Sequence, residues 1–134
     1  MLPGMLIAAL VFAGLAAVIH VYIFVLESLR FDQPSTWSVF GVKGAEEAAV
    51  MRPWAYNQGF YNLFLAIGTA AGIGLTAGGD HDPGLALVTF CCGSMVAAAL
   101  VLVSSDARQA RGAIVQGTLP AAALLWLLVL LLVG

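Results

Sequence analysis

Two residues of the first hydrophobic segment, His20 and Glu27, carry side chains that could transfer a proton. They are seven residues apart, so on a helix they lie close to the same face. Ionisable groups inside membrane segments are costly and often mark functional sites. We therefore interpret Glu27 and His20 as candidate catalytic acid/base residues. The alternative is structural: Glu27 pairs with Arg52, and His20 is a hydrogen-bonded core residue.

A second polar set opens the next hydrophobic segment. On a helix, Asn57 faces the same way as Tyr61, and Gln58 the same way as Asn62, with about 100° between the two faces. The spacing predicts a broad polar wedge in which Tyr61 is a third candidate catalytic residue. Gln116 of the last segment is expected at the same depth in the membrane, since it follows Arg111 by five residues. The candidate ligand-binding residues are Asn57, Gln58, Asn62, Arg52, Gln116 and Trp54.

These polar residues all fall in one half of the predicted spans, the half nearest the arginines. The sequence therefore predicts a polar cavity that opens at that side. The alternative is that amide side chains simply join helices, at about 0.6–2 kcal/mol each. We expect the threonines and serines of the other half to bond their own backbone.

No metal site or cofactor is expected. His81 falls on the opposite side of the membrane from the candidate site, and no second His or Cys stands at ligand spacing. The adjacent Cys91 and Cys92 lie in an apolar run and are interpreted as buried thiols. The chain shows no phosphate loop or nucleophile elbow.

The elements that must position these residues are membrane spans. The chain of 134 residues is 62% hydrophobic and only 9% charged, whereas soluble domains carry about 25% charged residues. Four runs each reach the roughly 20 apolar residues that a span requires. We predict an all-α integral membrane protein, a four-transmembrane-helix bundle forming a single domain over residues 1–134. The expected helices are 2–29, 53–77, 83–105 and 112–133.

Several helix boundaries are also predicted. Pro53 suits the first position of the second span, and Asp82-Pro83 suits an N-cap and first position for the third. The hydrophobic start of the chain is expected to be a retained span rather than a signal peptide. The Leu-rich last span is expected to be the most exposed to lipid.

The basic residues predict the orientation. All five border or lie within the first and third connections, which the positive-inside rule places in the cytoplasm; they are Arg30, Lys43, Arg52, Arg108 and Arg111. Both termini should then lie outside. We expect the long first loop, residues 31–51, to fold over the cytoplasmic end, with residues 46–51 as a short surface helix.

Gly68 and Gly72 form a GxxxG pattern, which permits close approach of another helix. The partner could belong to the same chain, or to a second copy in a homo-oligomer.

Three motifs resemble those of a family of small bacterial membrane proteins catalogued as domain of unknown function thirteen-oh-four. They occur in the same order as in that family, and the resemblance as a whole covers nearly the whole chain; the motifs are His20–Glu27, Asn57–Ala66 and Gln116–Ala121. The resemblance implies four spans in the bacterial cytoplasmic (inner) membrane and brings no established activity. The chain departs from the family in residues 104–111, where a more Gly-rich connection is expected.

Arg52, Asn57 and the run 64–66 also resemble a succession in the membrane-associated eicosanoid and glutathione metabolism superfamily. The acidic residue that this superfamily places after the asparagine is missing, since Gln58 stands there. Glutathione chemistry is therefore not carried over.

The function that these residues favour is binding of a small hydrophobic molecule, with acid/base chemistry of an isomerase or lyase kind. One alternative is a small-solute or proton-coupled transport module, and another is an accessory subunit of a larger membrane complex. The expected partners are the lipid bilayer and the hydrophobic molecule, with no nucleic acid.

Overall fold

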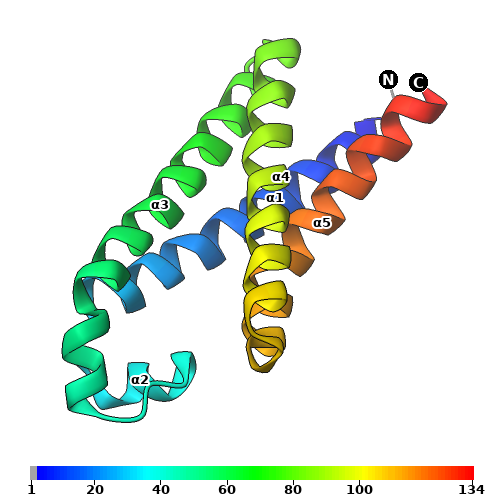
Figure 1. The fold of residues 1–134 in the computed structure, drawn as a ribbon. Helices are drawn as coiled ribbons and strands as arrows, with labels where there is room; N and C mark the ends of the chain where they lie inside the picture. The colour runs from blue at the N-terminus through cyan, green and yellow to red at the C-terminus, as the bar shows by residue number, and fades with distance from the viewer. Residues whose placement is uncertain (1–2) are drawn as a thin grey trace.

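The computed structural model describes residues 3–134, which are helical apart from short connections (Figure 1). Four helical segments are long and apolar enough to span a membrane. The predicted start of the first helix at Leu2 lies outside the described residues. The elements are α1 (Pro3–Phe24), a π-helical turn η1 (Val25–Leu29), α2 (Pro34–Phe40), α3 (Ala45–Ala77), α4 (His81–Ser105), a 3₁₀ turn η2 (Ala107–Gln109) and α5 (Ala110–Val133).

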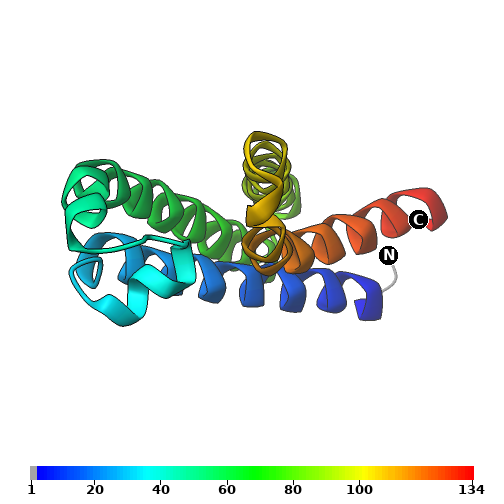
Figure 2. The ribbon, with the colours of Figure 1, turned by 60° about the horizontal axis from the view of Figure 1, so that its bottom comes forward.

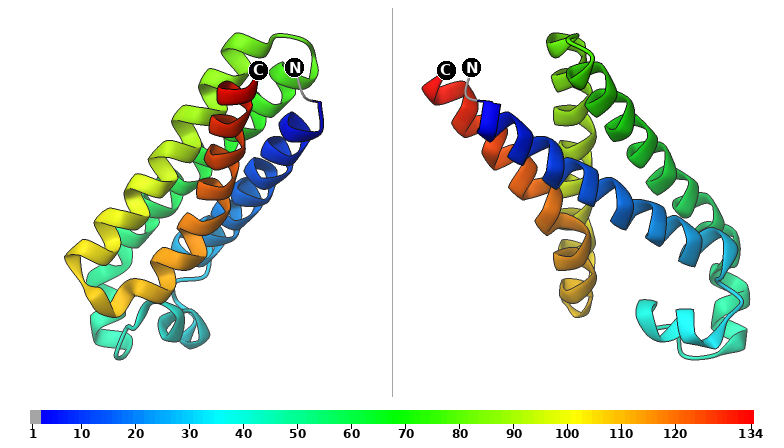
Figure 3. Two further views of the ribbon diagram at one scale, coloured as in Figure 1. Left: turned by 90° about the vertical axis from the view of Figure 1, so that its right-hand side faces the viewer. Right: turned by 180° about the vertical axis from the view of Figure 1, so that it is seen from behind.

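The long helices form a ring in the order α1, α3, α4, α5, with α1 packed against both α3 and α5. The first half of α1 lies along α5, and its second half lies along α3 (Figure 2). Both termini and the α3–α4 connection lie at one end of the molecule, which we call the terminal end. The connections that contain α2 and η2 lie at the other, the loop end (Figure 3).

The core consists mainly of small residues. The central cluster of fully buried side chains comprises Ala13, Ala16, Val88, Cys92, Met95 and Ala123. Small side chains let helix backbones approach closely, which is how helices associate where no water drives them together. Cys91 and Cys92 are free and buried, as predicted.

The GxxxG pattern of α3 faces α4 of the same chain. A Cβ added to Gly72 would lie 2.7 Å from the carbonyl oxygen of Gly84, and one added to Gly68 would lie 2.6 Å from the Cys91 Sγ. The intramolecular alternative is therefore correct. In this chain α4 covers the face that carries Gly68 and Gly72.

The second span begins earlier than predicted, since α3 starts at Ala45 and contains Pro53. Residues 46–51 are its first turns rather than a separate surface helix. Glu46 and Glu47 in the first turn complement the positive end of the helix dipole. Pro53 cannot donate a backbone hydrogen bond, and α3 changes direction in this region (Figure 1).

The starts of α4 and α5 also differ from the predicted boundaries. The N-cap of α4 is Asp80 rather than Asp82, so Pro83 lies within the first turn, where the missing N–H costs little. The last helix begins at Ala110 rather than 112. Only 11% of the last span is buried, against 28–33% of the other three, which confirms that it is the most exposed.

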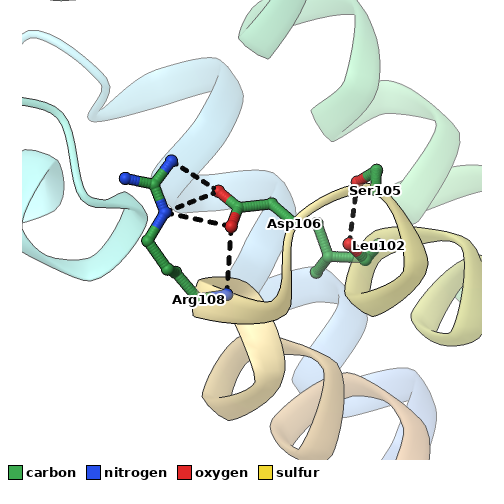
Figure 4. Close-up of polar contacts among 4 residues, drawn as sticks. All are labelled: Leu102, Ser105, Asp106 and Arg108. Atoms are coloured by element: carbon green, nitrogen blue, oxygen red, sulfur yellow. Dashed lines mark hydrogen bonds and ion pairs between the residues drawn. The ribbon is translucent and has the colours of Figure 1, made fainter.

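Asp106 holds the connection between α4 and α5. Its carboxylate accepts hydrogen bonds from the Arg108 backbone N–H at 3.0 Å and from the Arg108 guanidinium, also at 3.0 Å (Figure 4). The neighbouring Ser105 hydroxyl donates to the Leu102 carbonyl at 2.7 Å. This polar turn replaces the Gly-rich connection expected from the family.

The first loop lies at the loop end and contains α2. The Trp37 Nε1 donates to the Phe31 carbonyl at 2.6 Å. Gly41 ends α2 with a φ of 69°, a left-handed conformation that favours glycine. A Cβ at Gly41 would lie 4.0 Å from the Gln109 Nε2, so the loop reaches the α4–α5 connection. The loop therefore lies at this end and approaches the α4–α5 connection at Gly41, but α2 does not pack extensively on the long helices as the prediction required.

Candidate functional site

The π-helical turn η1 places Glu27 inside the contact between α1 and α3. The Arg30 N–H donates to the Val25 carbonyl at 2.9 Å, a bond that spans five residues instead of four. The consecutive Leu26 and Glu27 are both buried. Single π-turns inside α-helices occur frequently at functional sites.

Asn62 of α3 holds the Glu27 carboxylate. The Asn62 Nδ2 donates to the Glu27 Oε1 at 3.1 Å and to the Gln58 carbonyl at 3.2 Å. Glu27 is 9% exposed and Asn62 is 6% exposed. No described residue donates to the second carboxylate oxygen, Oε2. The carboxylate is thus fixed through one oxygen and free at the other.

Ser28 and Gly59 bring the two backbones together next to this pair. The Ser28 hydroxyl donates to the Tyr56 carbonyl at 2.8 Å. A Cβ at Gly59 would overlap the Ser28 Oγ and would lie 3.1 Å from the Ser28 backbone nitrogen. Gly59 is therefore the residue that permits η1 to lie against α3.

A cavity of about 10 Å³ adjoins Glu27 on the side of the loop end. That is about the volume a single water molecule requires. Its lining consists of Glu27, Ser28, Leu29, Phe31, Asp32, Arg52 and Tyr56. The cavity admits one non-hydrogen atom of a ligand and is much smaller than the predicted polar cavity.

Arg52 lines this cavity but forms an ion pair with Asp32. The predicted pairing of Arg52 with Glu27 is therefore wrong. Both members of the Asp32 pair are more than half exposed, which is where a charge pair avoids the cost of desolvation. Glu27 instead has an uncharged partner, the Asn62 amide.

His20 lies two turns deeper on the buried side of α1. Its Nδ1 lies 2.8 Å from the Ala16 carbonyl oxygen. Because a carbonyl only accepts, Nδ1 carries the proton and donates to Ala16. The lining of the cavity at Glu27 does not include His20, and no hydrogen bond joins the two. The structure therefore brings His20 and Glu27 to one side of the helix without joining them.

Most of the predicted polar wedge points outward. Asn57, Gln58 and Trp54 are exposed, and Tyr61 is 57% exposed with its ring 6.5 Å from that of Phe64. A stripe of mostly small residues at helical spacing decides which face of α3 is buried: Gly59, Asn62, Ala66, Thr69, Gly72 and Thr76. Asn62 alone among the predicted amides of α3 belongs to this stripe.

Gln116 is half-buried on α5, which lies across the ring from α3. The structure therefore does not join Gln116 to Asn62. Five residues of the cavity lining were not predicted as site residues: Ser28, Leu29, Phe31, Asp32 and Tyr56. The small-residue stripe in the sequence signals the approach at Gly59, but nothing in the sequence signals Asp32.

In the half of α3 toward the terminal end, the threonine hydroxyls donate hydrogen bonds to backbone carbonyls of the same helix. Thr69 donates to the Leu65 carbonyl and Thr76 to the Gly72 carbonyl, both at 2.8 Å. Ser94 of α4 does the same with Phe90. This part of the prediction is confirmed for Thr69, Thr76 and Ser94, whereas no side-chain hydrogen bond of Thr89 is found among the described residues. Over residues 3–134, no three His, Cys, Asp or Glu side chains lie close enough to hold a metal ion.

Comparison with known sequences gives one result. Residues 14–128 match the sequence model of a family described as protein of unknown function (DUF1304). No curated protein and no solved structure matches the chain.

Proposed function

The chain belongs to the DUF1304 family, and we propose that it binds a small hydrophobic molecule in the membrane and acts on it through Glu27. One observation carries this proposal. Glu27 is buried between α1 and α3, its Oε1 accepts a hydrogen bond from Asn62, no described residue donates to its Oε2, and Glu27 lines a small cavity. A carboxyl group fixed in this manner can give a proton when protonated, or accept one when ionised, at a defined position.

The size of the cavity limits what reaches Glu27. A space of about 10 Å³ admits only one small polar group. The apolar body of the molecule must then remain among the helices and the lipid. The sequence predicted a larger polar pocket. The proposed site is smaller, because one functional group of the ligand contacts one carboxyl group, that of Glu27.

An accessory subunit is the second candidate, and it has an observation of its own. Asn57 and Gln58 are exposed on α3, where a neighbouring membrane helix could bond them. Transport is less well supported because Thr69 and Thr76 donate within α3, so that no polar path continues beyond Asn62 along that helix.

We also propose the orientation that the basic residues favour. The loop end carries all five arginines and lysines, so it would face the cytoplasm and both termini would lie outside. The membrane would be the cytoplasmic membrane of a bacterium. Glu27 would then lie near the inner surface, within reach of water.

Native mass spectrometry in a mild detergent tests the proposed function. We expect the wild type to retain a discrete small molecule that Glu27→Gln loses, because the amide keeps the shape but not the acid/base group. Glu46→Gln is the matched control, since Glu46 is an exposed carboxylate of α3. Loss of a co-purified protein from Gln58→Leu alone would support the accessory subunit instead.

The wild type, Glu27→Gln and Glu46→Gln also test whether the Glu27–Asn62 contact is purely structural. If all of them carry only ordinary phospholipid at equal occupancy, the proposed function is wrong. Glu27 and Asn62 would then serve only to join α1 to α3.

A further inference from the structure

A row of aromatic rings runs from the Glu27 cavity along α3. Tyr56 lines the cavity, and its ring centre lies 5.1 Å from that of Phe60, which lies 6.2 Å from that of Phe64. From the opposite helix, Phe24 of α1 meets Phe60 edge-on at 5.1 Å. The three α3 residues are spaced four apart, so they share one face.

This aromatic row faces outward along the contact between α1 and α3. Tyr56 and Phe64 are exposed, and Phe60 is half-buried. Because α3 runs from the loop end toward the terminal end, the row extends from the cavity into the membrane over about 12 Å. It offers an apolar surface that begins at a carboxylate.

The chemistry at that carboxylate selects the polar group of the ligand. In its ionised form the Glu27 carboxylate only accepts hydrogen bonds, so the unbonded Oε2 would then pair with a donor group of the ligand. The cavity admits one non-hydrogen atom, which fits a hydroxyl or an amine. A carboxylic acid or a phosphate group has too many non-hydrogen atoms for a space of this volume.

We propose that this surface binds an amphiphile with a single terminal hydroxyl or amine. The donor enters the cavity and bonds Glu27, while the apolar chain lies over Tyr56, Phe60 and Phe64. This inference rests on the proposed function and names its substrate class.

Photocrosslinking with four matched probes tests the substrate class. The probes are a long-chain primary alcohol carrying a diazirine in its chain, the corresponding primary amine, the methyl ether and the carboxylic acid. We expect the alcohol and the amine to label residues 56–64 saturably. The ether, which cannot donate, and the acid should remain at the background of an inert alkyl diazirine.

Two variants connect the labelling to the residues. Glu27→Gln should lower labelling by the amine at least tenfold, since it removes the negative charge. Phe64→Leu should lower labelling by both donors severalfold without unfolding the protein, because Phe64 is exposed. Glu46→Gln should leave all labelling unchanged. Circular dichroism of each variant shows that the helices remain intact.

Two results would overturn the inference. One of them leaves the proposed function supported, and the other rules out both. Equal labelling by all four probes would mean general lipid contact, yet an endogenous molecule lost only from Glu27→Gln would still support the proposed function. Saturable labelling that Glu27→Gln does not change, together with no such endogenous molecule, would remove both.

Discussion

The Glu27 carboxyl group receives its hydrogen bond from one neighbouring side chain, that of Asn62. Its partner Asn62 is neutral, so the pair avoids a second buried charge but gives the carboxylate only one hydrogen bond. A buried polar group that loses its partner costs more than the hydrogen bond itself contributed. The Asn62 amide is therefore the residue through which the site can be weakened without touching the carboxylate.

Replacing Asn62 with leucine should destabilise the protein by about 1–3 kcal/mol, because Glu27 and the Gln58 carbonyl both lose a donor. Thermal unfolding in detergent measures the loss. The double variant Glu27→Leu/Asn62→Leu should recover most of it, since replacing both partners by apolar groups can be nearly neutral. An Asn62→Leu protein as stable as the wild type would contradict this account.

Gly59 is the second sensitive position at this scale. Gly59→Ala should cost about 1–3 kcal/mol, because the new methyl group overlaps Ser28 and forces α1 and α3 apart. Gly74→Ala in the same helix is the control: its Cβ would meet nothing within 4 Å, so it should be neutral or slightly stabilising. Denaturation in mixed micelles compares the two, and equal effects would count against the close approach.

At the scale of the elements, the contact between the π-turn η1 and α3 positions Glu27. The extra residue in the turn lets Leu26 and Glu27 both face the protein, while Gly59 lets the turn lie against α3. The Ser28 hydroxyl fixes the contact by bonding the Tyr56 carbonyl. The position of the carboxylate is thus a property of two helices in contact.

The ion pair in the α4–α5 connection predicts how the stability of the protein depends on pH. Hydrogen bonds from the Arg108 side chain, and secondly from its backbone N–H, hold the pKa of Asp106 below its ordinary value of 3.8. A lowered pKa means that the stabilisation is present above the ordinary value and is lost as the pH falls through the folded-state value. Asp106→Asn should therefore unfold at a slightly lower temperature than the wild type at neutral pH.

The difference between Asp106→Asn and the wild type should begin to shrink near pH 3.8, and it should disappear only as the pH falls through the lower pKa of the carboxyl in the folded protein. Melting temperatures recorded from pH 7 to about pH 2 provide the comparison. A difference that persists at the acid end would mean that Asp106 acts through its shape rather than its charge.

At the scale of the whole molecule, the orientation in the membrane can be measured with cysteine labelling. Asp82→Cys lies near the terminal end and Glu46→Cys near the loop end, and both positions are exposed. In intact cells, a membrane-impermeant maleimide should label Asp82→Cys, and it should label Glu46→Cys only after permeabilisation. The wild type is the background, since Cys91 and Cys92 are buried. The reverse pattern would place the termini inside.

The sequence by itself determined the broad architecture. The number of spans follows from the lengths of the apolar runs, because a bilayer of fixed thickness requires a fixed length of helix. It also indicated that Glu27 and Asn62 need hydrogen-bond partners, since polar groups within apolar runs are costly wherever they lie, and the structure pairs the two. The starts of α3 and α4 were misplaced because Pro53 and Pro83 are tolerated inside these helices at positions where sequence rules expect a boundary.

Only the tertiary structure decided which polar residues meet. Asn57, Gln58, Asn62 and Tyr61 are equivalent in sequence as polar residues of one segment. The face that packs is chosen by the small residues that let α1 and α4 approach, and Asn62 alone shares that face. Likewise, the pairing of Arg52 with Asp32 instead of Glu27 depends on where the first loop turns. Such choices follow from helix contacts and so lie beyond the pattern of a single segment.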